Sequence, residues 1–174
     1  NYTKNQYLAG TQNWGIQQDA AGRMYFANNE GLLTFDGNYW RKYHLPSKTK
    51  VRSLAIASDG KIYVGGENEI GYFSPSENGV LAYHSLKQLL PEKDQTFYDV
   101  WNVCVWKESV FFRSSSRIFE YKANKISVYR PSSHWRFLGK SSEKLIAQDF
   151  DKGLLYFENG QWKPFSTDLQ LLGK

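Results

Sequence analysis

The chain has 174 residues and a formal net charge of +5, and aromatic side chains make up 17% of it. This length suits one domain with a sizeable core, and the aromatic content favours β-strands. A single cysteine, Cys104, excludes an internal disulfide bond, and no apolar run is long enough to cross a membrane. The 22 basic residues are spread along the chain, which indicates a solvated surface or a basic face for an acidic ligand, and no nucleic-acid partner is expected.

A turn-and-strand pattern recurs about every 40 residues. Gly22 and Gly60, each in a turn before a strand that contains tyrosine, lie 38 residues apart. The segment Gly31–Phe35 returns as Gly153–Phe157, 122 residues later. A period of this length, built of short strands, is typical of β-propeller blades. The sequence therefore predicts an all-β fold of four four-stranded antiparallel units that belong to a larger propeller.

The expected elements follow one order in every unit, with an inner strand first and a more amphipathic outer strand last. In the first unit the inner strand is Trp14–Gln18, and Asp36-Gly37 predicts the hairpin before the outer strand. Residues 86–90 predict a short helical turn before Pro91, and residues 169–174 are interpreted as the start of a fifth unit. We expect a partial propeller domain over residues 1–174 with blades at 13–45, 51–86, 97–130 and 135–166.

The repeat also carries a family resemblance. The segments Gln12–Asp19, Asn29–Gly37 and Val51–Leu54 resemble the two-component regulator propeller repeat, and the resemblance weakens in the third unit, where Ser114–Arg117 replaces a Gly-Leu step. It implies the periplasmic sensor region of Bacteroidetes hybrid two-component or triple-tyrosine-motif transmembrane regulators. In that family the blades precede a β-sandwich, a membrane helix and a histidine kinase or helix-turn-helix output. Any membrane contact and any kinase activity would then belong to other parts of the parent protein.

The side chains that could carry catalysis are scattered. His44 and His84 each follow a tyrosine at the end of an outer strand, 40 residues apart, so they occupy a repeat position of the scaffold. His134 lies in a predicted loop without an assignable partner, and Asp149-Phe150-Asp151 lacks the glycine and distal glutamate of a calcium loop. The sequence therefore predicts no catalytic residue, no metal site and no cofactor.

Binding residues are expected on one face of the propeller. Loops that enter the inner strands and loops between the second and third strands emerge together near the propeller axis. Their aromatic, amide and guanidinium groups suit sugar rings and carboxylates. The alternative is that Trp14 and Trp101 only fill the space around the propeller axis. Trp40 and Trp162 are expected to pack between neighbouring blades. The candidate ligand-binding residues are Trp14, Asn29, Arg52, Asn68, Trp101, Arg113 and Trp135.

These observations favour a non-catalytic periplasmic sensor that responds to a carbohydrate-derived signal. Its partners would be an oligosaccharide or another small ligand, a neighbouring propeller or β-sandwich domain, and a second copy docked on exposed apolar faces. Two alternatives remain open from the sequence. One is a scaffold propeller that binds proteins, and the other is a propeller enzyme that acts on carbohydrates, which would need carboxylates or a tyrosine or histidine base near the axis.

Overall fold

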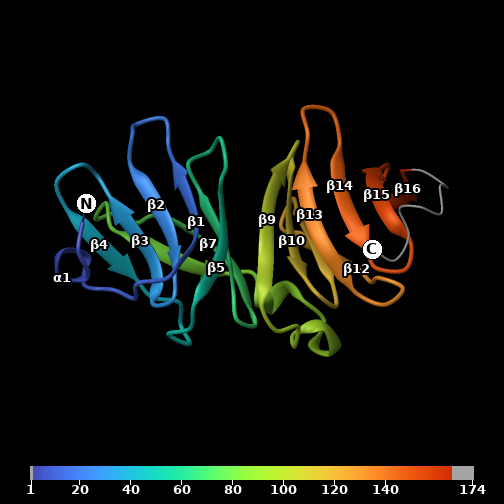
Figure 1. Cartoon of the computed structure of the whole chain (residues 1–174), viewed down its shortest axis with the longest axis horizontal. Coiled ribbons are helices and arrows are strands. Elements are labelled where there is room, and N and C mark those ends of the chain that lie inside the picture. The colour runs from blue at the N-terminus through green and yellow to red at the C-terminus, as the bar shows by residue number, and fades with distance from the viewer. Residues whose placement is uncertain (1, 166–174) are drawn as a thin grey trace.

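The computed structural model describes residues 2–165, and it confirms the all-β fold predicted from the sequence. The described strands form four antiparallel sheets of four, and every sheet consists of consecutive strands. Figure 1 shows the sheets fanned in chain order from blue to red, with the first and the fourth at opposite ends. The first strands of successive sheets lie side by side, as the inner strands of four propeller blades do.

Each blade occupies one contiguous stretch of the chain. Blade 1 contains β1 (Asn13–Gln18), β2 (Met24–Asn28), β3 (Gly31–Phe35) and β4 (Trp40–Tyr43). Blade 2 contains β5 (Val51–Ile56), β6 (Ile62–Gly66), β7 (Glu69–Pro75) and β8 (Leu81–Ser85). Blade 3 contains β9 (Val100–Trp106), β10 (Ser109–Ser114), β11 (Ile118–Lys122) and β12 (Lys125–Tyr129). Blade 4 contains β13 (Trp135–Lys140), β14 (Leu145–Asp149), β15 (Gly153–Glu158) and β16 (Gln161–Pro164).

Within residues 2–165, three short helical segments lie outside the sheets. The turn predicted near residues 86–90 is the 3-10 helix η1 (Lys87–Leu89), and a second one, η2 (Glu92–Asp94), follows it. The helix α1 (Lys4–Tyr7) was not predicted, because four residues are too few to show a helical pattern. No helix within residues 2–165 is long and apolar enough to span a membrane. Residues 169–174, interpreted as the start of a fifth unit, lie outside the described part.

The repeated Asp–Gly turns have a clear physical cause. The Oδ1 of Asp19 accepts hydrogen bonds from the backbone N–H of Ala21 and Arg23, and Gly22 adopts a φ of 85° that disfavours other residues. The second blade repeats the device, since Asp59 accepts from the backbone N–H of Lys61 and Gly60 has a φ of 80°. This geometry is the reason why the turn recurs in the sequence.

Apolar side chains form three layers, one between each pair of neighbouring blades. In the two central blades the second strand is buried on both faces, so every residue of β6 and of β10 is buried. In blade 4, by contrast, burial alternates along β14, because only the face toward blade 3 is covered. The outer faces of blades 1 and 4 are therefore not covered by another described sheet.

The N-terminal segment lies across part of the free face of blade 1. The Tyr2 and Tyr7 rings contact the Trp40 ring at centroid distances of 5.4 and 5.5 Å, and Lys42 Nζ donates to the Leu8 carbonyl at 2.9 Å. Trp40 therefore packs against its own blade and this segment, not between two described blades as expected. Trp162 lies in the layer between blades 3 and 4, 5.6 Å from the Trp135 ring.

Candidate functional site

The inner strands share an irregularity at the same position. The strand register skips the second residue of β1, β5, β9 and β13, so each of these residues is the extra residue of a β-bulge. A bulge re-aims the side chain of its extra residue and is frequent beside binding sites. We call these four the bulge residues, and around the inner strands they alternate between an indole and a guanidinium: Trp14, Arg52, Trp101 and Arg136.

Three of the bulge residues form a stack across blades 1 to 3. The Arg52 guanidinium lies 4.1 Å from the centre of the Trp14 ring and 4.9 Å from that of the Trp101 ring. The two indoles also meet edge to face, with centroids 5.9 Å apart. Trp14 and Trp101 are 37% and 40% exposed, so part of each residue is open to solvent. Cation–π contacts of this kind hold a guanidinium in place.

Polar partners fix this stack. Arg52 Nε donates to Asp99 Oδ1 at 3.2 Å, which neutralises a side chain that is only 9% exposed. The indole N–H of Trp14 donates to Asn29 Oδ1 at 2.8 Å, and the Asn29 amide donates in turn to Gln12 Oε1. Asn29, a predicted binding residue, thus orients Trp14. The structure thus brings together four of the candidate residues, Trp14, Asn29, Arg52 and Trp101.

Arg136, the fourth bulge residue, was not among the candidates from the sequence. Its guanidinium lies 4.1 Å from the centre of the Phe150 ring, and its Nε donates to His134 Nε2 at 3.2 Å. The side chain is exposed, on the strand that neighbours the strand of Trp101. A signal for it exists in the sequence: Arg136 follows the first residue of its inner strand, as Arg52 and Trp101 do.

Arg113 lies on β10 and not in a loop, and it is 7% exposed. Its Nε donates to Asn102 Oδ1 at 2.7 Å, and its Nη1 donates to the Trp135 carbonyl at 2.8 Å. Both partners are neutral. Burial lowers the pKa of the Arg113 guanidinium to about 10, so it still carries its charge at neutral pH.

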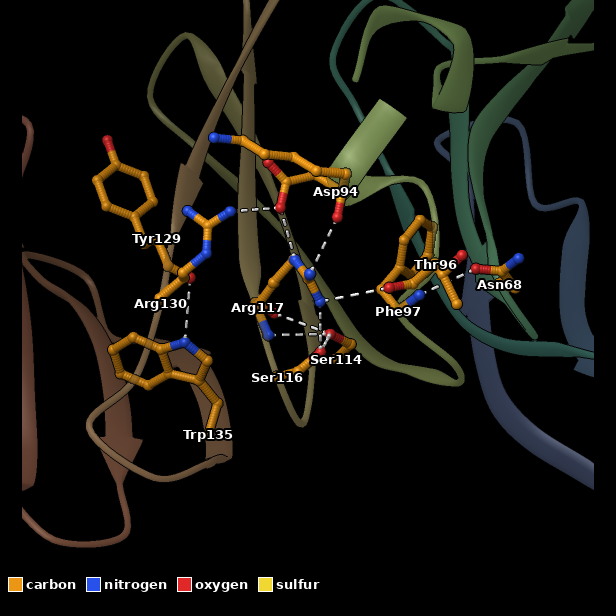
Figure 2. A network of polar contacts seen from close by, with 11 residues as sticks. Asn68, Asp94, Thr96, Phe97, Ser114, Ser116, Arg117, Tyr129, Arg130 and Trp135 are labelled. Carbon is orange, nitrogen blue, oxygen red and sulfur yellow. Dashed lines mark hydrogen bonds and ion pairs between the residues drawn. The ribbon is translucent and has the colours of Figure 1, made fainter. Parts of the chain in front are cut away.

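Two further candidates belong to the framework. Trp135 is 2% exposed, and its indole N–H donates to the Tyr129 carbonyl at 3.3 Å (Figure 2). Asn68 has a φ of 55°, and its Oδ1 accepts from the backbone N–H of Phe97 at 3.0 Å. Both side chains are thereby committed to blade packing and loop structure, and neither adds exposed surface beside the indole stack.

The connection between blades 2 and 3 is held by a charge network that the sequence did not suggest. Asp94 in η2 is buried, and its Oδ1 accepts from Arg117 Nε at 2.9 Å and from Arg130 Nη2. Figure 2 shows the Arg117 side chain between this carboxylate and the Thr96 carbonyl, which it also reaches. Arg117 and Arg130 therefore hold the connection against blade 3. Their ion pairs with Asp94 make them poor candidates for ligand binding.

Several histidine and carboxylate side chains of the described residues make structural contacts. No group of three or more histidine, cysteine or carboxylate side chains within 2–165 could hold a metal ion. His84 stacks on Tyr72 with ring centroids 4.9 Å apart, and Asp149 accepts hydrogen bonds from the backbone N–H of Ser132, Asp151 and Lys152. These side chains stabilise the scaffold.

Comparisons with known proteins bear on the fold. No family model matches the chain, and a search of curated proteins finds no match. The solved structures that resemble it include the extracellular domain of the hybrid two-component system BT4673 from B. thetaiotaomicron, with a TM-score of 0.68 and 16% identity. They also include virginiamycin B lyase from Staphylococcus aureus, with a TM-score of 0.71 and 19% identity, and the WD40 β-propeller domain of Doa1, with 0.58 and 11%.

The chain corresponds to part of each of these proteins. The alignment covers 92% of this chain and 22% of the BT4673 domain, 98% and 59% with the lyase, and 92% and 59% with Doa1. These neighbours include the extracellular domain of a two-component system and an enzyme, and at such low identity the likeness extends to the fold alone. Taken with the four sheets, the comparisons identify the chain as β-propeller in fold.

Proposed function

We propose that this chain is a ligand-binding propeller segment in the periplasmic sensor region of a transmembrane signalling protein. It binds a carbohydrate-derived ligand without catalysis, and ligand binding changes how the segment packs against neighbouring propeller or β-sandwich domains. A signal of this kind requires that the ligand bind one packing more tightly than the other. The sensor domain of BT4673 supports this proposal as a neighbour in fold, and so does the repeat resemblance in the sequence.

The observation that carries the proposal is the stack of Trp14, Arg52 and Trp101. Sugar rings bind to proteins through aromatic faces and hydrogen-bond donors, and this stack presents two partly exposed indoles around a fixed guanidinium. Because β-bulges on separate blades aim these side chains, a shift between blades would alter the surface that they form. The stack thus provides a physical link from ligand to packing.

A carbohydrate-active enzyme is the second candidate, and one observation favours it. His134 lies beside the bulge residue Arg136 and accepts a hydrogen bond from it, so an imidazole is available near the inner strands. Against this candidate, no carboxylate occupies a bulge position, and Asp99 is paired with Arg52. A non-catalytic binding surface agrees better with these residues.

A glycan-binding screen followed by calorimetry tests the proposal. We expect the protein to bind selected oligosaccharides without cleaving or modifying them. The Trp14→Ala and Trp101→Ala variants should each bind these oligosaccharides at least tenfold more weakly. Val80→Ala, a change of an exposed apolar residue in a turn of blade 2, is the matched control. Turnover of a bound glycan that is abolished in His134→Ala would favour the enzyme, and full binding by both tryptophan variants would refute the proposed site.

A further inference from the structure

Blade 3 departs from the repeat at one position beside the inner strands. In each blade, the inner-strand residue that follows the bulge residue pairs with one residue of the second strand. In blades 1 to 4 these inner-strand residues are Gly15, Ser53, Asn102 and Phe137. Their equivalent partners on the second strands are Ala27, Gly65, Arg113 and Gln148. Two of the four are small, so blade packing does not in general require a large cation at this place.

The contact that Arg113 makes with blade 4 also has a neutral counterpart. Arg113 Nη1 donates to the carbonyl of Trp135, the first residue of β13. Between blades 2 and 3 the same kind of link is made by the Ser53 hydroxyl, which donates to the carbonyl of Val100, the first residue of β9, at 2.7 Å. A hydroxyl is therefore enough to join two blades. The positive charge of Arg113 is not needed for the junction.

That charge is also uncompensated. Arg52 pairs with Asp99, and Arg117 and Arg130 pair with Asp94. By contrast, neither Arg113 nor Arg136 forms an ion pair with a described side chain, and their hydrogen bonds go to neutral acceptors. Buried charges in proteins are normally paired, so Arg113 is in an environment that an anion would improve.

A carboxylate of blade 4 does not act as a counter-ion for Arg113. Asp149 lies opposite Trp135 in the strand register, but its two oxygens accept from three backbone N–H groups of the loops around it. The Nη2 of Arg113 and both Nη atoms of Arg136 donate to no described residue. Arg113 bonds to the Trp135 carbonyl and Arg136 is the next residue in the chain, so two arginines with free donors belong to the same end of β13.

From this arrangement we infer that the inner-strand surface of blades 3 and 4 recognises an anionic group of the ligand, a carboxylate or a sulfate, through Arg113 and Arg136. The inference rests on the proposed function and names its ligand class, an acidic saccharide. Guanidinium groups bind such anions through paired, charge-assisted hydrogen bonds. The partly exposed indole of Trp101, on the neighbouring inner strand, would stack on the sugar ring that bears the acid.

Calorimetric titration with three probes tests the inference. The probes are trigalacturonate, its fully methyl-esterified form and inorganic sulfate. We expect the acid to bind at least tenfold more tightly than the ester, and sulfate to compete with the acid. Added sodium chloride should weaken binding of the acid but not binding of the ester. In Arg136→Gln the affinity for the acid should fall to that for the ester. Arg41→Gln, which removes an exposed cation from the outer strand β4, should leave it unchanged.

Arg113→Gln is the second variant, because glutamine occupies the equivalent position in blade 4 and its amide nitrogen stands where Arg113 Nε donates to Asn102 Oδ1. We expect this single variant also to lower the affinity for the acid, and a cooperative melting transition checks that the fold is retained. Equal binding of acid and ester would overturn the inference and leave the proposed function standing. Failure of both the acid and sulfate to bind would overturn the inference. Tight binding of the acid that survives Trp14→Ala and Trp101→Ala would support the anion subsite and refute the proposed glycan site instead.

Discussion

Asp94 and Arg113 are both buried charges, and the structure treats them differently. Burial by itself raises the pKa of the Asp94 carboxyl, but the hydrogen bonds from Arg117 and Arg130 outweigh this effect and hold the pKa below its usual value. Arg113 has only neutral partners, and its pKa falls to about 10. The paired charge of Asp94 fixes the connection between blades 2 and 3. The unpaired charge of Arg113 favours the binding of an anion from solution.

Replacement of Asp94 by asparagine should be strongly destabilising, because it leaves two guanidinium groups beside a buried site without their counter-charge. We expect the free energy of unfolding to fall by about 1–3 kcal/mol, through the loss of charge-assisted hydrogen bonds at a buried carboxylate. Urea denaturation measures it. The matched control is Asp59→Asn, whose exposed pair with Lys61 should cost less than about 1 kcal/mol. Equal losses in the two variants would contradict the role of the network.

The same carboxyl predicts an acid-sensitive component of stability. Because the pKa of Asp94 is lower in the folded state than in the unfolded chain, its contribution is complete above the ordinary carboxyl pKa of about 4 and disappears as the pH falls through the folded value. The stability difference between the native protein and Asp94→Asn should therefore be constant from pH 7 to about pH 5 and shrink below about pH 4. A difference that grows toward low pH would contradict this sign.

At the scale of elements, the sequence was sufficient for the strands but not for the bulges. Glycine turns such as Gly22 and Gly60 have a strict backbone requirement, so they recur visibly and fix the order of strands. A bulge is a property of two paired strands, and neither strand alone shows it. Arg136 lies 122 residues after Trp14, the same interval that separates Gly31 from Gly153, but an arginine in place of a tryptophan hides this equivalence when side chains are compared and the strand register is not known.

The packing of neighbouring blades depends on small residues on the second strands. A Cβ atom at Gly65 would lie 2.4 Å from Val100 Cγ1 and 2.8 Å from Ser53 Oγ. We therefore expect Gly65→Ala to lower the free energy of unfolding by about 1–3 kcal/mol through overpacking between blades 2 and 3. In the control, Gly15→Ala, the new Cβ would meet Ala27 at an ordinary 3.9 Å and should cost nothing. Denaturant titration of both variants tests this, and a neutral Gly65→Ala would refute it.

At the scale of the whole molecule, the arc has two faces without a described neighbour. On blade 1, Ile16 is 57% exposed and lies beside Phe26, next to a cavity of about 450 Å³ lined by Tyr2, Phe35 and Trp40. On blade 4, Phe137 is 46% exposed, although its ring lies over Gly139. Patches of this kind mark interaction sites. The resemblance to larger propellers makes another blade the natural cover for both faces.

The segment should therefore associate with a second copy when it is prepared alone. Light scattering over a range of concentrations is expected to give masses above that of one chain. Phe137→Glu should return the protein to a monomer with an unchanged melting temperature, because the side chain is outside the layer that joins blades 3 and 4. Val80→Glu introduces the same charge at an exposed turn and should not alter the mass. A strictly monomeric native protein would show that the four blades suffice alone.

Apart from the isolated bridge between Glu67 and Asp99, the strand pairs within residues 2–165 each form within one uninterrupted stretch of chain, because no described sheet contains a strand from another blade. The junctions at residues 44–50, 86–99 and 130–134 are consequently places where genetic recombination can insert, delete or exchange a whole blade without breaking a ladder. Recombination within a blade would divide its sheet. Such proteins can therefore change length in steps of one repeat, and a ligand surface carried by one residue per inner strand would gain or lose one side chain at each step.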